Sequence, residues 1–178
     1  MIKIILTLLI LILSQNISAN DFRLQFHNGQ KAFSEKNYEK AHTIWLELAE
    51  KGYPQAQSTL AYLYASGTGV DKNFEISAKW MTKAANQGEL QSMYNLAGMY
   101  FEGKGVDIDY KKSEELYRDS LQKGFKVSVS GLIQLYRNNI IKPKDAKEKE
   151  YWEREEKLLL DSSYVQKLYS ESRNASMP

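Results

Sequence analysis

Apolar and polar positions recur along this chain with a period of 36 residues. Gly52, Gly88 and Gly124 each mark the end of one copy of the pattern. Other series with the same spacing are Leu60, Leu96 and Leu132; Tyr64, Tyr100 and Tyr136; Tyr38, Phe74 and Tyr110; and Ile44, Trp80, Leu116 and Trp152. A repeat of a few tens of residues indicates an array of stacked units, each of which buries its apolar face against its neighbours.

Each copy contains two helical patterns. Residues 54–66 place apolar side chains at helical spacing, and Pro54 suits the first turn of a helix, where its missing N–H costs nothing. Residues 73–86 form the second pattern, with Trp80 and Met81 directed inward. The sequence contains no run of alternating apolar residues that would predict a strand. The chain is therefore expected to be all-α, a solenoid of antiparallel helix pairs.

The first 19 residues have the pattern of a secretory signal peptide. Lys3 gives the start a positive charge, residues 4–13 are apolar except for Thr7, and Ala19 is a small residue before the expected cleavage site. An apolar stretch of this length rises about 15 Å as a helix, half of a bilayer core, so it is too short for a permanent anchor. We expect residues 1–19 to be removed, and the product to be periplasmic or secreted without stable membrane insertion. An uncleaved N-terminal segment is the alternative.

Residues 20–143 hold the repeats, and residues 144–178 form a separate C-terminal region. In this region the pattern predicts a partial repeat, one long helix over 144–172 and a disordered tail. The apolar stripe of the long helix consists of Trp152, Leu159, Val165 and Leu168. A helix that caps the last repeat is expected, because solenoids need a polar outer surface at their ends. The alternatives are a helix that folds into the groove of the solenoid or pairs with a second copy.

Composition excludes several classes of function. The chain has 178 residues, with 24 basic against 22 acidic side chains, so it lacks the basic excess of a nucleic-acid-binding protein. It has no cysteine, which excludes disulfides, thiolate nucleophiles and cysteine-bound zinc. Its two histidines, His27 and His42, are too few for an imidazole metal site. We expect no metal, no cofactor and no nucleic-acid partner.

The repeats carry two further motifs, Leu-Ala-x-x-Tyr and Gly-x-Gly-Val. In the second unit these are Leu60-Ala61-x-x-Tyr64 and Gly67-x-Gly69-Val70, followed by Trp80 and Ala84-Ala85-x-x-Gly88; in the third they are Leu96-Ala97-x-x-Tyr100 and Gly103-x-Gly105-Val106, followed by Leu116 and Gly124. The pattern resembles the Sel1-like repeat family, a relative of the tetratricopeptide repeats. The first unit, about Phe22 to Gly52, lacks the glycine loop and looks more like a plain tetratricopeptide repeat. In the last unit the loop is replaced by residues 138–143.

The resemblance implies a right-handed α-solenoid with a concave face that binds a partner protein, and no catalysis. By alignment with the tetratricopeptide relatives, certain positions of the first helix of each unit face the groove. These are Phe26, Gln30 and Phe33; Gln55, Ser58, Tyr62 and Ala65; Gln91, Tyr94, Gly98 and Phe101; and Val127, Ser130, Gln134 and Arg137. Aromatic and arginine side chains dominate binding energy in protein interfaces, and amides add adaptable hydrogen bonds. We expect the partner site at Phe26, Phe33, Gln55, Tyr62, Gln91, Tyr94, Phe101, Gln134 and Arg137.

An enzymatic alternative rests on one short motif. Ser120-x-x-Lys123 matches the Ser-x-x-Lys of penicillin-recognising hydrolases, and cysteine-rich relatives of the repeat family are linked to β-lactam binding. However, Ser120 shares the repeat position of Ala84, a packing position, and the other motifs of those enzymes are absent. The glycine loops lack the Gly-Lys-Ser/Thr ending of a phosphate-binding loop. Both motifs are interpreted as structural.

The predicted function is therefore that of an exported, non-catalytic bacterial repeat protein that binds another protein. Small exported members of the family act as envelope adaptors or regulators, or occur beside toxins such as phospholipases as immunity proteins. The partner is accordingly expected to be an envelope component or a toxin. A β-lactam-binding or cell-wall-acting hydrolase and a purely structural self-assembling protein are the alternatives.

Overall fold

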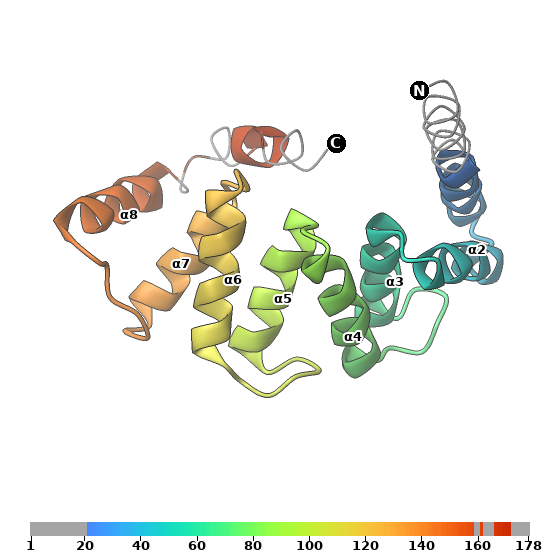
Figure 1. Cartoon of the computed structure of the whole chain (residues 1–178), viewed down its shortest axis with the longest axis horizontal. Helices are drawn as coiled ribbons and strands as arrows, with labels where there is room; N and C mark the ends of the chain where they lie inside the picture. Colours follow the sequence, from blue (N-terminus) through green and yellow to red (C-terminus); the bar gives the residue numbers. More distant parts are fainter. Residues whose placement is uncertain (1–20, 159–160, 162–165, 172–178) are drawn as a thin grey trace, which may run out of the picture.

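The computed structural model of the chain describes residues 21–158, 161 and 166–171. The predicted signal peptide at 1–19 and the predicted tail after residue 171 lie outside this part. Within it every regular element is an α-helix, and the helices stack side by side along the long axis of the molecule (Figure 1). The helices are a first one through 21–34, α2 (Tyr38–Glu50), α3 (Pro54–Ser66), α4 (Phe74–Asn86), α5 (Leu90–Glu102), α6 (Tyr110–Gln122), α7 (Ser128–Arg137), α8 (Ala146–Leu158) and a last turn at 166–171. The all-α prediction is confirmed.

The second helix of each unit begins after a capping residue that recurs every 36 residues. The side chains of Asn37, Asn73, Asp109 and Asp145 each accept a hydrogen bond of 2.8–3.2 Å from the backbone N–H three residues later. A side-chain oxygen at this position satisfies one of the amide groups that the first turn leaves without a partner. This series, which the sequence contains but the predictions above did not use, determines where α2, α4, α6 and α8 begin.

The Gly-x-Gly-Val loops are tight structural turns, as the sequence analysis interprets them. Gly69 and Gly105 both have positive φ angles, 73° and 71°. A Cβ atom on Gly105 would lie 2.0 Å from the carbonyl oxygen of Phe74, and one on Gly69 would lie 2.3 Å from Cβ of Tyr38. Only glycine allows both this conformation and this close approach. Each loop therefore packs directly against the start of the second helix of the preceding unit.

The core consists of three apolar clusters along the stack. The N-terminal cluster is centred on Trp45 and Leu60, the middle one on Leu96 and Phe125, and the C-terminal one on Leu132. The leucine series Leu60, Leu96 and Leu132 is at most 2 % exposed. Trp80 is half-buried and packs against both the N-terminal and the middle cluster, which joins them.

The prediction of one long helix over 144–172 is wrong. α8 ends at Leu158 and Asp161 is not helical, while residues 166–171 form a further helical segment. Figure 1 shows this last segment turned back over the ends of α5 and α6. Trp152 on α8 is buried in the C-terminal cluster, whereas Leu168 is buried in the middle cluster. One straight helix does not bring both side chains to these two places, so the chain bends between them.

Candidate protein-binding surface

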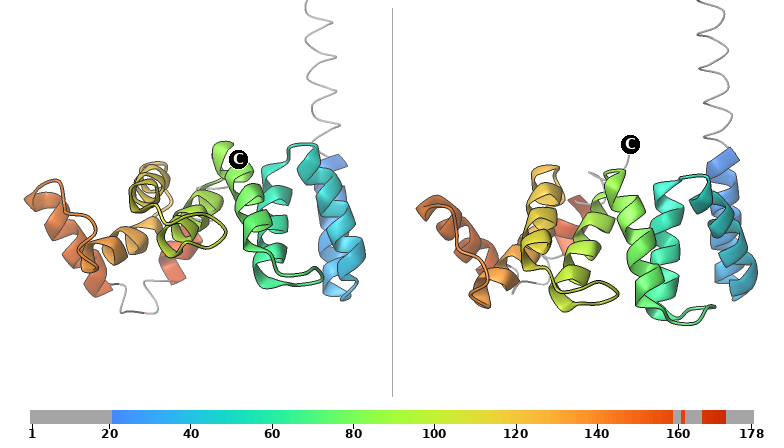
Figure 2. Two further views of the ribbon diagram at one scale, coloured as in Figure 1. Left: turned by 90° about the horizontal axis from the view of Figure 1, so that it is seen from below. Right: turned by 60° about the horizontal axis from the view of Figure 1, so that its bottom comes forward.

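The predicted binding residues lie on the first helix of each unit, namely the helix through 21–34, α3, α5 and α7. We call these four helices the first-helix layer. α5 contacts α7 directly although α6 lies between them in the sequence, as expected for two helices of one layer. The row of helices curves between helix 21–34 at one end and α8 at the other (Figure 2).

Tyr62 is the most exposed aromatic residue of the predicted site. Its side chain lies on α3 and is 64 % exposed. The next two units carry Gly98 and Gln134 at the same repeat position, so the ring has no counterpart on α5 or α7. Burying a tyrosine of this kind against a partner supplies a large apolar area together with a hydroxyl that forms hydrogen bonds. Gln55, on the same helix, is half-buried.

Leu24 is a second exposed apolar residue on this layer, and it was not among the predicted site residues. It lies 36 residues before Leu60 and is therefore the first member of the buried leucine series. In contrast to Leu60, Leu96 and Leu132, it is 61 % exposed. The 36-residue period of the leucine series is the sequence signal that identifies Leu24.

Phe26 and Phe33 are half-buried and pack inside the chain. Their ring centroids lie 6.0 and 5.7 Å from that of Trp45, and Phe33 also meets Tyr38 edge-on at 5.1 Å. Part of each ring therefore packs against the N-terminal cluster, and only the remaining face is available to a partner.

Tyr94 and Phe101 on α5 are likewise half-buried. The Tyr94 ring lies 5.4 Å from Tyr117 and 5.8 Å from Phe125, and its hydroxyl lies 3.4 Å from that of Ser130. The Phe101 ring lies 5.8 Å from that of Tyr110. Both aromatic residues thus contribute to packing between units as well as to the predicted surface.

The polar members of the predicted site differ in exposure. Gln91 is half-buried and donates a hydrogen bond from its amide to Oδ1 of Asn95 at 3.1 Å. Gln134 and Arg137 are exposed on α7. Val127, which the alignment also placed in the groove, is only 4 % exposed, so its placement there is wrong. It precedes α7 and belongs to the middle cluster, where Leu168 also packs.

The last described segment, residues 166–171, covers the predicted surface around Tyr94. Leu168 is 4 % exposed and shares the middle cluster with Phe125 and Val127. The Glu171 carboxylate forms an ion pair of 2.7 Å with Lys126. Burial and the neighbouring phenol of Tyr94 both raise the pKa of Tyr169. The predicted surface is therefore open around Tyr62 and occupied by the chain itself around Tyr94.

The comparisons with known proteins agree with this architecture. A family model described as Sel1 repeat matches residues 26–53, 54–89 and 90–125, which together make up more than half of the sequence. The chain belongs to the Sel1 repeat family. The matched segments include the first unit, whose sequence looked closer to the tetratricopeptide relatives, and end before α7. No curated protein matches the sequence of this Sel1 repeat chain.

Two solved structures are similar to this Sel1 repeat chain. One is a Sel1 repeat protein from Oxalobacter formigenes, with 32 % identity and a TM-score of 0.62, covering 71 % of this chain and 52 % of that one. The other is c5321, a protective antigen present in uropathogenic Escherichia coli strains, with 25 % identity and a TM-score of 0.69, covering 88 % of this chain and 39 % of that one. This chain thus spans about half the length of the first protein and two fifths of the second.

The two residues of the Ser-x-x-Lys motif in this Sel1 repeat chain have structural contacts. Ser120 is fully buried, and its hydroxyl lies 2.6 Å from that of Ser128 and donates to the carbonyl oxygen of Leu116 at 2.8 Å. Lys123 is exposed and paired with Asp119 at 2.9 Å. The two motif residues therefore do not form a nucleophile and base pair, and Ser120 is out of reach of a substrate.

The histidines do not converge on a metal site in the described part of the chain, where no group of three or more histidine or acidic side chains has suitable geometry. Nε2 of His42 lies 3.2 Å from the hydroxyl of Tyr64, and burial lowers the pKa of His42. His27 is exposed on the first helix. Also within the described residues, no helix is both long and apolar enough to cross a bilayer.

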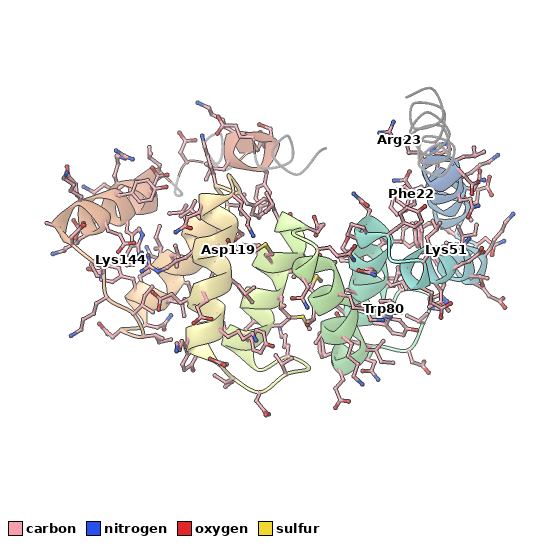
Figure 3. All side chains as sticks on the ribbon, viewed as in Figure 1. Phe22, Arg23, Lys51, Trp80, Asp119 and Lys144 are labelled. Atoms are coloured by element: carbon pink, nitrogen blue, oxygen red, sulfur yellow. The ribbon has the colours of Figure 1, made fainter. Side chains whose placement is uncertain are left out.

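A pocket of about 600 Å³ lies on α4, away from the first-helix layer. Ile76, Trp80 and Val106 form its apolar wall. The Lys83 ammonium group lies 4.0 Å from the centroid of the Trp80 ring, which is labelled in Figure 3. Sequence analysis assigned Trp80 to the interior, but the ring reaches the surface on this side.

Proposed function

We propose that this Sel1 repeat protein is exported by a bacterium and binds a partner protein through the open part of its first-helix layer. The observation that carries this proposal is the exposure of Tyr62, a residue that is 64 % exposed on a helix of that layer. The stack does not require a tyrosine at this position, since the equivalent residues in the next two units are Gly98 and Gln134. Exposed aromatic side chains on a rigid scaffold are frequent anchors of protein interfaces.

The location proposed for the protein is the periplasm or the exterior of the cell. Support comes from the sequence of residues 1–19 and from the bacterial origin of the two similar structures. One of those proteins is a protective antigen, which favours a location that antibodies reach. Within this location the proposed partner is an envelope component, for an adaptor or regulator, or a toxin such as a phospholipase, for an immunity protein. No catalytic activity is proposed.

A crosslinked pull-down from the cell envelope tests this proposal. The baits are the natural chain, Tyr62→Ala and the matched control Tyr110→Ala, which removes a ring that is 41 % exposed on α6, outside the first-helix layer. We expect the natural chain and Tyr110→Ala to capture the same partner and Tyr62→Ala to lose it, with all three equally helical by circular dichroism. Equal capture by all three baits would move the binding site away from Tyr62. The identity of the captured protein then distinguishes an envelope role from toxin neutralisation.

Because Tyr94 and Phe101 also pack inside the chain, substituting them together with Tyr62 would mix binding with stability. The single substitution at Tyr62 avoids this, since an exposed side chain usually contributes within about 0.5 kcal/mol to the free energy of unfolding. A toxin made only by competitors would be missing from the resting cell. The same three baits are therefore also incubated with envelope and secreted proteins of competing strains.

A further inference from the structure

Residues 166–171, which we call the latch segment, bind the chain's own surface as a short amphipathic helix. Leu168 is its buried side chain and packs in the same cluster as Phe125, Val127 and Met93. Three residues later, Glu171 pairs with Lys126 at 2.7 Å. Residues three apart lie on the same face of a helix, so the leucine and the carboxylate point together at the turn between α6 and α7.

The surface under the latch segment has the two features that such a helix needs. Phe125 and Val127 supply an apolar seat, and the ammonium group of Lys126 lies between them in the sequence and binds the carboxylate. Protein grooves that take amphipathic helices use the same combination, with apolar anchors at helical spacing and charges at the margin. Tyr94, a residue of the predicted partner site, packs against the same apolar cluster as Leu168.

The latch segment is held weakly. Of its side chains only Leu168 is buried, while Gln166, Lys167, Tyr169 and Ser170 are exposed. The Lys126–Glu171 pair is 56 % and 36 % exposed, and exposed ion pairs of this kind contribute little stability. A cavity of about 350 Å³ lies between the segment and α8, with Tyr151 and Arg154 on one side and Lys167 and Glu171 on the other. Among the described residues, its docking therefore depends on one buried leucine and one exposed ion pair.

We propose that the surface under the latch segment is a binding site for an amphipathic helix of the partner protein, which carries an aliphatic residue followed three residues later by a carboxylate. The latch segment occupies this site until the partner helix replaces it. This inference rests on the proposed function, because it names the kind of partner protein that binds and adds a second contact surface at the turn between α6 and α7. A partner that supplies more than one apolar anchor gains more buried area than Leu168 alone and therefore displaces the segment.

The test uses the full chain and one probe, a fluorescent synthetic peptide with the sequence of residues 161–174. Leu168→Asp releases the latch segment without changing the surface beneath it, and Ser170→Asp introduces the same charge at an exposed position of the segment. We expect the peptide to bind the Leu168→Asp chain about tenfold or more tightly than it binds the natural chain or the Ser170→Asp chain, in which the site is already occupied. Glu171→Lys serves as a second releasing variant, because it replaces the ion pair with Lys126 by a like-charge repulsion and leaves the apolar cluster intact.

Charge reversal gives the test its specificity. Adding Lys126→Glu to the Leu168→Asp chain should weaken binding of the peptide, and a peptide carrying Glu171→Lys should restore it. Equal affinity for all chains, or no binding to either released chain at concentrations up to about 1 mM, the effective concentration of a short tether, would overturn the inference. Formation of dimers by the released chains would also overturn it, because the site would then take a second copy rather than a partner.

The two proposals fail separately. None of the peptide measurements depends on Tyr62, and the pull-down with Tyr62→Ala does not depend on the peptide. Loss of peptide selectivity with Tyr62-dependent capture intact would remove only the helix site. The reverse result would leave a helix-binding surface and remove the open face as the partner site.

Discussion

The ring of Tyr117 on α6 lies directly against the backbone of Gly131 on α7, so closely that a Cβ atom on Gly131 would be 2.3 Å from its Cζ atom. Trp45 occupies the same repeat position as Tyr117, two periods earlier, and it contacts a helix-interior glycine in the same way. A Cβ atom on Gly29 would lie 2.5 Å from Nε1 of Trp45. In both units a large ring therefore approaches the backbone of a neighbouring helix at a point where no side chain is present.

Gly131→Ala is accordingly expected to destabilise the chain although alanine is the better helix former. Overpacking of a filled core costs about 1–3 kcal/mol, which exceeds the gain in helix propensity. Gly98→Ala is the matched control, because a Cβ atom on Gly98 would lie at an ordinary 3.5 Å from the Tyr117 hydroxyl. It should be neutral or stabilise the chain by up to about 1 kcal/mol. Thermal unfolding of the two variants and the natural chain measures both effects. An unchanged Tm for Gly131→Ala would contradict the close packing of Tyr117 against Gly131.

Leu96→Ala should lower the free energy of unfolding by about 2–5 kcal/mol, since the side chain is 2 % exposed at the centre of the middle cluster and its removal opens a cavity. Trp80→Ala should cost a comparable amount, at the lower end of this range, because its ring is only half-buried. Urea unfolding followed by circular dichroism measures both. Tyr62→Ala, an exposed site, serves as the reference, and a Leu96→Ala transition coinciding with it would contradict the repeat alignment.

Arg118 joins α6 to α8 and should contribute more stability than the exposed ion pairs. Its guanidinium group donates to Glu114 at 2.7 Å and to Glu148, and lies 5.4 Å from the centroid of the Trp152 ring. Desolvation lowers the pKa of Arg118, but the hydrogen bonds that it donates to Glu148 and Glu114 outweigh this effect and raise the pKa.

Arg118→Lys should cost about 1–3 kcal/mol, because an ammonium group does not replace two hydrogen bonds and the contact with the indole ring. Lys123→Ala breaks the exposed pair with Asp119 and should cost less than about 0.5 kcal/mol. Hydrogen exchange adds a local measurement, in which Arg118→Lys alone should lower the protection of α8. Equal changes in the free energy of unfolding for the two substitutions would show that the Arg118 contacts contribute no more stability than an exposed ion pair.

His42 should make stability depend on pH in the mildly acidic range. Because burial lowers the pKa of His42, the unfolded chain binds a proton at this position at a higher pH than the folded chain. The free energy of unfolding is therefore higher at neutral pH. It falls as the pH drops through the ordinary imidazole range, between about pH 7.5 and 5.5. His42→Gln removes this titration. Urea midpoints at the two ends of the range should differ more for the natural chain than for His42→Gln, and parallel pH profiles would refute the assignment.

The sequence by itself determined the helix pairs and their boundaries. The predicted helices 54–66 and 73–86 agree with α3 and α4 to within one residue, because Pro54, Gly67 and Asn73 act on the backbone within a single turn. The leucine series marked the core in the same way, since each repeat buries the same positions against its neighbour. The 36-residue period of the sequence also includes the helix-capping residues Asn37, Asn73, Asp109 and Asp145.

Only the tertiary structure decided which predicted surface residues are open and which are covered. Tyr62 is exposed, whereas Tyr94 packs against Tyr117 and against the cluster that Leu168 joins, although both were predicted from the same alignment. The contact between Lys126 and Glu171 joins residues 45 positions apart. This ion pair does not follow the 36-residue period. The apolar stripe that includes Leu168 is equally compatible with a straight helix and with a bent one. The difference lies in the buried area that Leu168 gains beside Phe125, which exists only once α6 and α7 have packed together.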